Sequence, residues 1–110
     1  MIKKQNLLFI CSRNQWRSPT AEAHWKKHPN YNVRSAGTSP NARRTVNSSD
    51  IQWADIIFVM ERKHKSRLIS RFTRIIKYKK VYVLDIPDNY KFMDEALIIE
   101  LEGAVSLFID

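Results

Sequence analysis

The sequence predicts an α/β fold with a parallel sheet covered by helices on both faces, because apolar runs alternate with polar segments of helical spacing. Four short apolar runs recur along the chain, at residues 7–10, 33–36, 56–60 and 81–84. The first, third and fourth are continuous rather than alternating, which is typical of strands buried on both faces. Right-handed crossovers between such strands would join them into one sheet.

Three segments carry the signals of helices. The first begins at Ser18-Pro19, because serine can cap a helix and proline suits its first position, and we expect it to run to about His28. The second begins at about Glu61, and its apolar residues, three and four apart, are Leu68, Phe72, Ile75 and Ile76. The third has one apolar stripe, made of Met93, Leu97, Leu101, Ala104, Val105 and Phe108. The polar residues 38–53 predict a loop with at most a short helix.

Length and composition predict a single folded domain over residues 1–110 and exclude several classes of protein. Hydrophobic residues make up 44% of the chain, which excludes a disordered protein. The single cysteine excludes an internal disulfide, and the two glycines are too few for a dinucleotide fingerprint or a Walker loop. Since no apolar run could span a membrane or act as a secretory signal, we expect a cytoplasmic protein without a membrane partner.

Positive charge is concentrated in the first three quarters of the chain, which has a formal net charge of +8. Residues 1–84 carry 18 basic and 4 acidic side chains, whereas residues 85–110 carry 1 basic and 7 acidic ones. The densest basic run, residues 62–80, is either the solvated face of a helix or a field that attracts an anionic partner. Because no recognition module accompanies this run, we do not expect a nucleic acid partner.

The strongest chemical signal lies between the first predicted strand and the first predicted helix, in the segment Cys11-Ser12-Arg13-Asn14-Gln15-Trp16-Arg17-Ser18. A loop at the carboxyl end of a parallel strand that leads into a helix directs backbone N–H groups toward an anion. Arg17 adds a fork that matches two phosphate oxygens, and the positive surroundings favour the thiolate of Cys11. Ser18 can donate a hydrogen bond to that thiolate, so Cys11 is a candidate in-line nucleophile for a phosphate ester. The alternative is an inert cysteine buried at the end of a strand.

The segment from Leu8-Phe9-Ile10-Cys11 through Arg17-Ser18-Pro19-Thr20-Ala21-Glu22 resembles the active-site segment of the low-molecular-weight protein tyrosine phosphatases. The resemblance continues in the same order in Ser35-Ala36-Gly37-Thr38, in residues 54–60 with the later His64, and in Asp88-Asn89-Tyr90. It implies a three-layer α/β sandwich with a four-stranded parallel sheet in the order 2-1-3-4. The implied activity is hydrolysis of phosphate monoesters, with phosphotyrosine as the expected substrate.

The resemblance also assigns roles to single residues. Cys11 would form a phosphocysteine intermediate and Arg17 would bind the phosphoryl oxygens. The expected substrate-binding residues are Ser12, Arg13, Asn14, Gln15, Trp16, Ser18 and Tyr90, with Asn14 also holding a left-handed backbone turn. The family uses an aspartate after the last strand as its proton donor; Asp88 keeps the family spacing to Tyr90, and Asp85 is the alternative. The expected ligands are a phosphotyrosine protein or a small phosphate ester, and phosphate as product or inhibitor, with no metal or other cofactor.

Three features depart from the family pattern. The chain is short for the family, which predicts trimmed loops around residues 38–53. Trp16 stands where many members have a second cysteine, so Cys11 would lack a protective disulfide partner and would over-oxidise easily. Arg13 stands where the family often has glycine, and it is either an exposed loop residue or an additional contact to phosphate or peptide.

Other functions stay open on the sequence alone. A non-catalytic phosphate- or RNA-binding module would use the basic run with Trp16, Trp25 and Trp53 as stacking surfaces. An arsenate reductase would need external thiols because the chain has no further cysteine, and a phosphocarrier domain would not need Arg17. His24 and His28 have a spacing that can bind a metal, but without a third ligand nearby we expect a surface pair.

Overall fold

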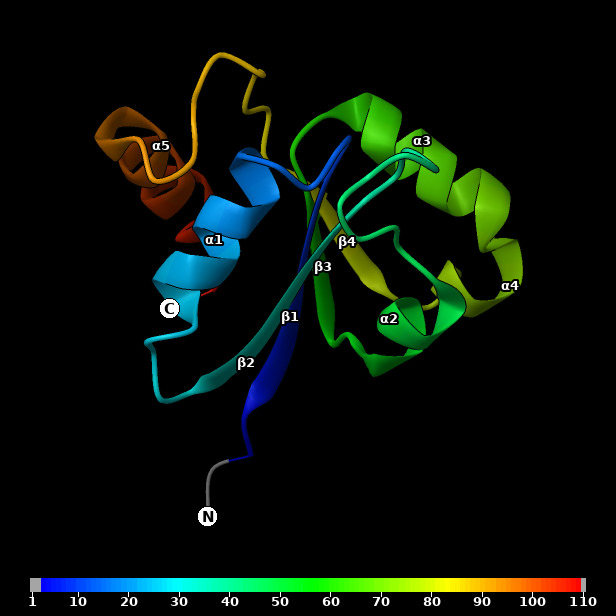
Figure 1. Cartoon of the computed structure of the whole chain (residues 1–110). Helices are drawn as coiled ribbons and strands as arrows, with labels where there is room; N and C mark the ends of the chain where they lie inside the picture. Colours follow the sequence, from blue (N-terminus) through cyan, green and yellow to red (C-terminus); the bar gives the residue numbers. More distant parts are fainter. Residues whose placement is uncertain (1–2, 110) are drawn as a thin grey trace.

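The computed structural model describes residues 3–109 as a central sheet flanked by helices (Figure 1). The strands are β1 (Gln5–Cys11), β2 (Tyr31–Gly37), β3 (Ile56–Val59) and β4 (Lys80–Val83). The helices are α1 (Arg17–Trp25), α2 (Ser48–Trp53), α3 (Arg62–Arg71), α4 (Thr73–Ile76) and α5 (Glu95–Val105). All four apolar runs therefore form strands, and residues 38–53 form a loop that ends in the short helix α2, as predicted.

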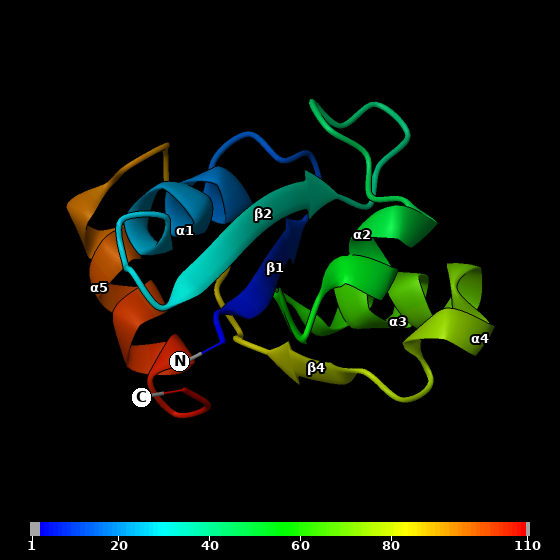
Figure 2. The same cartoon turned by 90° about the horizontal axis from the view of Figure 1, so that it is seen from below.

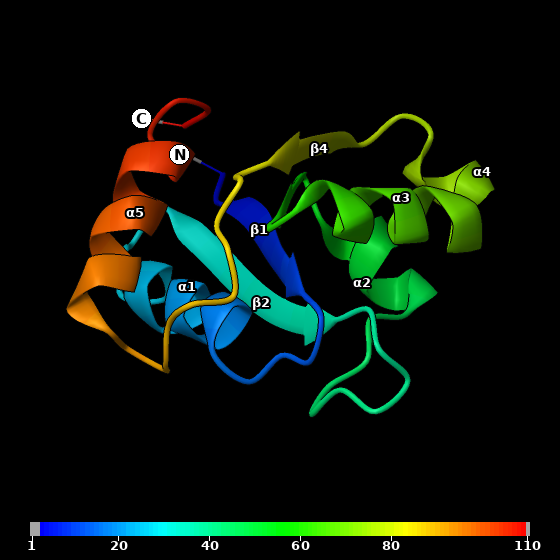
Figure 3. The same ribbon diagram turned by 90° about the horizontal axis from the view of Figure 1, so that it is seen from above.

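The four strands are parallel and lie in the order β2-β1-β3-β4, which confirms the expected order. β1 pairs with β2 up to Cys11 opposite Gly37, and with β3 up to Ile10 opposite Val59. The carboxyl ends of these strands meet at one edge of the sheet, so the loops that follow them converge there. Residues 84–94 run over this edge on the way from β4 to α5 (Figure 3).

Helices cover both faces of the sheet, with α1 and α5 on one face and α2, α3 and α4 on the other (Figures 1 and 2). β1 contributes to two cores: Leu7, Phe9 and Cys11 belong to the core under α1 and α5, and Leu8 and Ile10 to the core on the other face. This double burial is the reason that β1 is a continuous apolar run.

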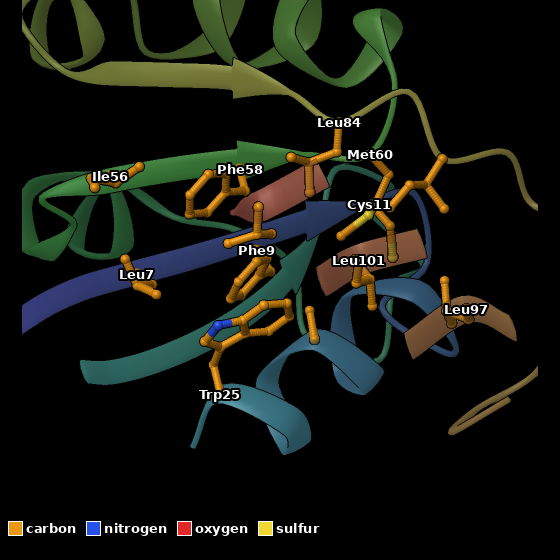
Figure 4. Packing of buried hydrophobic residues seen from close by; sticks show 13 residues of the cluster. Leu7, Phe9, Cys11, Trp25, Ile56, Phe58, Met60, Leu84, Leu97 and Leu101 are labelled. Carbon is orange, nitrogen blue, oxygen red and sulfur yellow. The ribbon is translucent and has the colours of Figure 1, made fainter. Parts of the chain in front are cut away.

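Phe9 is at the centre of the first of these cores, in which Cys11 also lies (Figure 4). Its ring stacks between Trp25 of α1 and Phe58 of β3, with ring centroids 5.4 and 5.2 Å away. The rings connect β1 with one helix and one strand, and so provide a rigid base for the end of β1 that carries the thiol.

Helix α1 differs from the prediction at both ends. It begins at Arg17 with Trp16 in the N-cap position and no side-chain capping bond, so Ser18 lies inside the first turn and is not the cap. The Ser18 hydroxyl contacts the Cys11 sulfur instead, 2.9 Å away. The helix ends at Trp25 rather than near His28. The chain tightens there into a turn in which the His28 N–H donates to the Trp25 carbonyl, three residues back, at 2.9 Å.

The predicted second helix is broken in two at Phe72, whose φ of −123° and ψ of 37° are outside the helical region. The Thr73 hydroxyl donates to the carbonyl of Ile69 at 2.8 Å, an interaction that competes with the backbone ladder. Leu68 and Ile76 are buried, as their spacing predicts.

Helix α5 is shorter than its predicted apolar stripe. Met93 has a left-handed φ of 62° and precedes the helix, which is capped by the Asp94 carboxylate accepting from the Ala96 N–H at 2.9 Å. Phe108 follows the helix and stacks on Tyr82, with ring centroids 4.1 Å apart. Within residues 3–109, no helix has the length and apolar character needed to cross a membrane.

Candidate active site

A cavity of about 250 Å³ opens where β1 ends and α1 begins. Seven of the ten residues expected at the site line it, and these are Cys11, Ser12, Arg13, Gln15, Trp16, Arg17 and Asp88. Asn14 and Ser18 are fully buried and lie behind the thiol. Tyr90 is half-buried against the core under α1 and α5, so its contact with substrate stays a prediction. Three of the elements at the sheet edge therefore contribute to a single cavity: β1, α1 and the segment after β4.

Two hydrogen-bond donors address the Cys11 sulfur. The Asn14 backbone N–H donates to it at 3.2 Å, and the Ser18 Oγ lies 2.9 Å from it. The Asn14 Nδ2 donates to Ser18 Oγ at 2.9 Å, so the hydroxyl proton of Ser18 can point at the sulfur or at its other acceptor, the Ala36 carbonyl at 3.4 Å. These two contacts fix the position of the Cys11 sulfur at the end of β1, where it lines the cavity.

Asn14 holds the turn of the loop. Its φ is 56°, in the left-handed region that asparagine tolerates better than most residues. Its Nδ2 also donates to the Ser35 hydroxyl at 2.9 Å, and Ser35 in turn donates to the Glu22 carboxylate at 2.5 Å. This chain of bonds fixes the Asn14 side chain between β2 and α1, so the loop cannot change its turn without breaking a buried network.

The loop carbonyls are held away from the cavity by residues 38–43, which we call the clamp segment. Backbone N–H groups of Thr38, Ser39 and Arg43 donate to the carbonyls of Cys11, Ser12 and Arg13, at 3.0, 2.9 and 3.0 Å. The Arg43 Nε donates to the carbonyl of Asn14 at 3.0 Å. In a planar trans peptide the C=O and the N–H point in opposite directions. Four carbonyls turned to the clamp segment therefore turn the N–H groups that follow them toward the cavity, where they can bind an anion.

Arg17 is positioned by two acceptors. It is 2% exposed, and its Nη1 donates to the Glu61 carboxylate at 2.5 Å and to the Ile86 carbonyl at 2.8 Å. Because both contacts use Nη1, the Nε–Nη2 edge of the guanidinium can engage two oxygens of a phosphoryl group. Partial burial raises the pKa of Glu61, but the hydrogen bond and positive charge of Arg17 outweigh it and hold this pKa below its ordinary value. Glu61 is therefore ionised when it holds Arg17.

His64 connects the site to α3. Its Nδ1 accepts from the Glu61 backbone N–H at 3.0 Å, so the ring proton lies on Nε2, which donates to the Ser12 hydroxyl at 2.8 Å. Ser12 consequently keeps its own proton for a ligand in the cavity. Burial, together with the nearby charge of Arg17, lowers the pKa of His64 to about 4, so the ring is neutral near pH 7.

The two candidate aspartates are in different environments. Asp88 lines the cavity, and its Oδ1 lies 3.7 Å from the Arg17 Nε. Both side chains are exposed, but Asp85 is not among the residues that line the cavity, and it has a left-handed φ of 56°. The segment that carries both is tied to α1 by the Met93 N–H, which donates to the Thr20 hydroxyl at 2.8 Å. Of the two aspartates, Asp88 is therefore the one placed beside a ligand in the cavity.

Glu61 and the clamp segment were not among the functional residues predicted from the sequence, and His64 was named there only as part of the family resemblance. Glu61 follows β3 almost directly, so its place at the same sheet edge as Cys11 was an available signal. The clamp segment acts mainly through backbone groups, which leave no signature in the residue types.

No cluster of metal ligands is present in the part of the chain that the structure describes: residues 3–109 hold no group of three His, Cys, Asp or Glu side chains that could bind an ion. His24 instead pairs with Glu102 at 3.1 Å, and the His28 ring lies against Tyr31 with centroids 4.7 Å apart. The two histidines are thus engaged separately, as expected of a surface pair.

Comparisons with known proteins give relatives in sequence and in fold, although no protein-family model matches the chain. The protein-arginine-phosphatase of Bacillus subtilis (strain 168) is 30% identical over a match of 96 residues, which covers 64% of that protein. The chain thus spans a little under two thirds of the length of this curated relative.

Solved phosphatase structures have the same fold. A protein tyrosine phosphatase from Entamoeba histolytica is 27% identical with a TM-score of 0.71, covering 92% of this chain and 90% of its own. A low-molecular-weight protein tyrosine phosphatase from Streptococcus pyogenes is 15% identical with a TM-score of 0.77, covering 96% and 94%. The second likeness concerns the fold alone, and the first extends to sequence over most of both chains.

Proposed function

We propose that the chain is a member of the low-molecular-weight protein tyrosine phosphatase family and that it hydrolyses phosphate monoesters through a phosphocysteine intermediate; its similarity to a protein-arginine-phosphatase and to solved tyrosine phosphatases supports this. One observation carries the proposal: a hydrogen-bonded thiol, a buried arginine and an aspartate from three different segments converge on one cavity. Each of the three supplies a different part of phosphoryl transfer, namely nucleophile, charge stabilisation and proton donor.

The first step transfers the phosphoryl group to the enzyme. The loop N–H groups and the Nε–Nη2 edge of Arg17 bind the three non-bridging oxygens, with the phosphorus in line with the Cys11 thiolate. The S–P bond forms as the bond between phosphorus and the ester oxygen breaks, and Asp88 gives its proton to that leaving oxygen. The clamp segment and Glu61 keep the donors in place, so little reorganisation is needed as charge spreads over the phosphoryl oxygens.

The second step releases phosphate. Asp88, now a carboxylate, accepts a proton from a water molecule whose oxygen attacks the phosphorus from the side that the leaving group has vacated. The S–P bond breaks and returns its electron pair to Cys11, which restores the thiolate. Inorganic phosphate is the product, and because it fits the same cradle it acts as a competitive inhibitor.

A phosphotyrosine protein is the substrate that the rim of the cavity favours. The Trp16 ring is 42% exposed and stands beside the opening, where it can pack against a phenyl ring. Phosphoarginine is the second candidate, because the curated relative is a protein-arginine-phosphatase. The exposed Arg13 on the same rim opposes the positive charge of an arginine side chain, and this favours the tyrosine ester.

The same enzyme is proposed to act in the cytoplasm, since a lone active-site thiol stays reduced where thioredoxin and glutathione are present. Two competing functions would use the same phosphate-binding loop without hydrolysing an ester. A phosphate- or RNA-binding module would bind its ligand without turnover, and an arsenate reductase would need an external thiol.

The test is hydrolysis of para-nitrophenyl phosphate near pH 6 under reducing conditions, with Cys11→Ser as the inactive control. Turnover that is lost in the variant supports the proposal. Phosphate binding by wild-type protein without turnover would favour the binding module, and thiol-dependent reduction of arsenate without ester hydrolysis would favour the reductase. Peptides with one phosphotyrosine or one phosphoarginine then separate the substrates, and we expect the higher kcat/KM for phosphotyrosine.

A further inference from the structure

A second cavity of about 570 Å³ lies beside the catalytic one. We call it the adjacent groove, and its lining residues are Gln15, Trp16, Pro19, Glu22, Ala23, Lys26, Arg43 and Phe92. Gln15 and Trp16 line both cavities, so the side chain of Trp16 forms part of the wall between them. A ligand that occupies the catalytic cavity can therefore continue directly into the adjacent groove.

The adjacent groove presents two exposed aromatic rings. Trp16 is 42% exposed and Phe92 is 53% exposed. Phe92 does not hang freely over the groove, because the next residue, Met93, is anchored by its N–H to the Thr20 hydroxyl of α1 at 2.8 Å. Two large apolar side chains at fixed positions beside an active site are typical of a surface that binds an apolar partner group.

The charges of the groove are mostly positive. Lys26 at the end of α1 is exposed, and Arg43 of the clamp segment uses its Nε for the Asn14 carbonyl, which leaves its terminal nitrogens to face a ligand. The acidic residue of the groove, Glu22, already accepts a hydrogen bond from Ser35 at 2.5 Å. The groove thus combines apolar contact with a positive rim, which matches a ligand segment holding an apolar and an acidic side chain.

We propose that the adjacent groove binds the polypeptide segment next to the phosphorylated residue of a protein substrate, with a large apolar side chain between Trp16 and Phe92 and an acidic side chain near Lys26 and Arg43. This inference rests on the proposed phosphatase activity and names its substrate class more closely. A small ester fills only the catalytic cavity, whereas a peptide fills both. Peptides with the same phosphorylated residue then differ in kcat/KM through their contacts with the adjacent groove and not through the phosphoryl transfer step.

The test compares kcat/KM for phosphotyrosine peptides, each expressed relative to para-nitrophenyl phosphate with the same enzyme. One peptide has alanine on both sides of the phosphotyrosine, and the others place leucine or phenylalanine with glutamate on its amino-terminal or carboxyl-terminal side. We expect at least one of the apolar–acidic peptides to exceed the alanine peptide by about tenfold, because a buried large apolar side chain contributes that much to binding.

Matched variants locate the effect. Phe92→Ser and Lys26→Glu should each reduce the peptide preference severalfold. Tyr78→Ser, an exposed aromatic residue on the α4–β4 connection, and Lys27→Glu, the neighbour of Lys26, should leave the preference as in the wild-type protein. Because each preference is a ratio within one enzyme, a variant that is partly unfolded does not distort it.

Several outcomes would overturn the inference. Equal relative kcat/KM for all peptides would remove the groove from substrate selection, as would control variants that change the preference as much as the groove variants. If the wild-type protein formed a dimer in solution that Phe92→Ser abolished without changing the peptide preference, the groove would instead bind a second copy of the chain. Failure to hydrolyse even para-nitrophenyl phosphate would be a different result, because it would contradict the proposed function itself.

Discussion

Asp85 and Asp88 are three residues apart, yet the first differs from the second in both its contacts and its backbone conformation. Asp88 faces the Nε of Arg17, and Asp85 has the left-handed φ of 56° that turns the chain after β4. Asparagine tolerates this backbone conformation at least as well as aspartate, so Asp85→Asn is a mild change. Replacing each aspartate by asparagine in turn therefore distinguishes an effect on proton transfer, expected at Asp88, from an effect on the shape of the loop, expected at Asp85.

We expect Asp88→Asn to lower kcat for phenyl phosphate by about 10²- to 10⁴-fold, because the leaving phenolate is then expelled without its proton. Asp85→Asn should stay close to wild type. The loss in Asp88→Asn should be smaller with para-nitrophenyl phosphate, whose leaving group needs less protonation. Equal losses in the two variants would contradict this role.

His64 makes the stability of the fold depend on pH. Burial, with the positive charges of Arg17, Lys63 and Arg67, lowers its pKa to about 4 from the ordinary 6.5, while Glu61 opposes this shift. Between these two values the unfolded chain binds a proton that the folded chain does not, so the free energy of unfolding rises with pH over this window. Above pH 6.5 the ring is neutral in both states and contributes no pH dependence.

Urea denaturation between pH 4 and 7.5 tests this coupling. From pH 6.5 down to pH 4 the wild-type protein should lose up to about 3 kcal/mol through His64, and His64→Gln should lack this part of the decline. Carboxylates titrate in the same range in both proteins, so the difference between the two curves isolates the histidine. Parallel curves would show that His64 does not carry the proton linkage.

At the scale of elements, the clamp segment follows β2 and holds the phosphate-binding loop in place through hydrogen bonds to its carbonyls. The segment is itself held from two sides. Arg67 and Arg71 of α3 donate to the side chain and the carbonyl of Thr38, both at 3.2 Å, and the loop continues to Arg44, which donates to buried Asp50 of α2 at 2.5 Å. Part of the basic run on α3 is thus structural, in addition to its exposed charges.

Gly37 permits this support by its lack of a side chain. A Cβ at this position would lie 2.4 Å from the Ser12 carbonyl oxygen and 2.7 Å from the Ala42 Cβ, so the backbones of loop and clamp segment would have to separate. We expect Gly37→Ala to lower kcat/KM for para-nitrophenyl phosphate by about 10²-fold and the unfolding free energy by about 1–3 kcal/mol.

Gly103→Ala is the matched control, because nothing lies within 4 Å of a Cβ at that position in α5. Removing a glycine from a helix should raise the unfolding free energy by about 0.5–1 kcal/mol and leave kcat/KM unchanged. Wild-type activity in Gly37→Ala would show that the loop keeps its N–H groups in place without close contact to the clamp segment.

For the molecule as a whole, the sequence predicts those features that depend on local pattern. The strands follow from apolar runs because parallel strands are buried on both faces. The family resemblance, through its spacing from Asp88 to Tyr90, points to the aspartate that lines the cavity. The pair of Arg17 and Glu61 joins residues 44 apart, and this pairing depends on β3 lying beside β1, which periodicity does not determine. The break at Phe72 was missed because its apolar spacing continues through both helices.

The charge distribution is also a property of the whole molecule, and it predicts how fast anionic substrates are captured. Exposed cations of the loop, the clamp segment and α3 surround the sheet edge that carries the cavity, while most acidic residues lie after β4. Such a field raises the local concentration of a phosphate dianion and is screened by salt. We expect kcat/KM for para-nitrophenyl phosphate to fall severalfold between about 0.05 and 0.5 M salt, with kcat nearly constant, because screening acts on capture and not on the bound complex.

Two charge reversals of equal size show whether this field is local. Arg62 begins α3 next to the site, whereas Lys4 precedes β1 at the opposite edge of the sheet, roughly 20 Å away along the strand. At 0.1 M salt the screening length is only about 10 Å, so Arg62→Glu should weaken the salt dependence and Lys4→Glu should leave it unchanged. The two variants could instead show the same salt dependence, or kcat/KM could fail to respond to salt at all. Either result would show that the basic residues do not steer the substrate and act only in solubility or in holding the clamp segment.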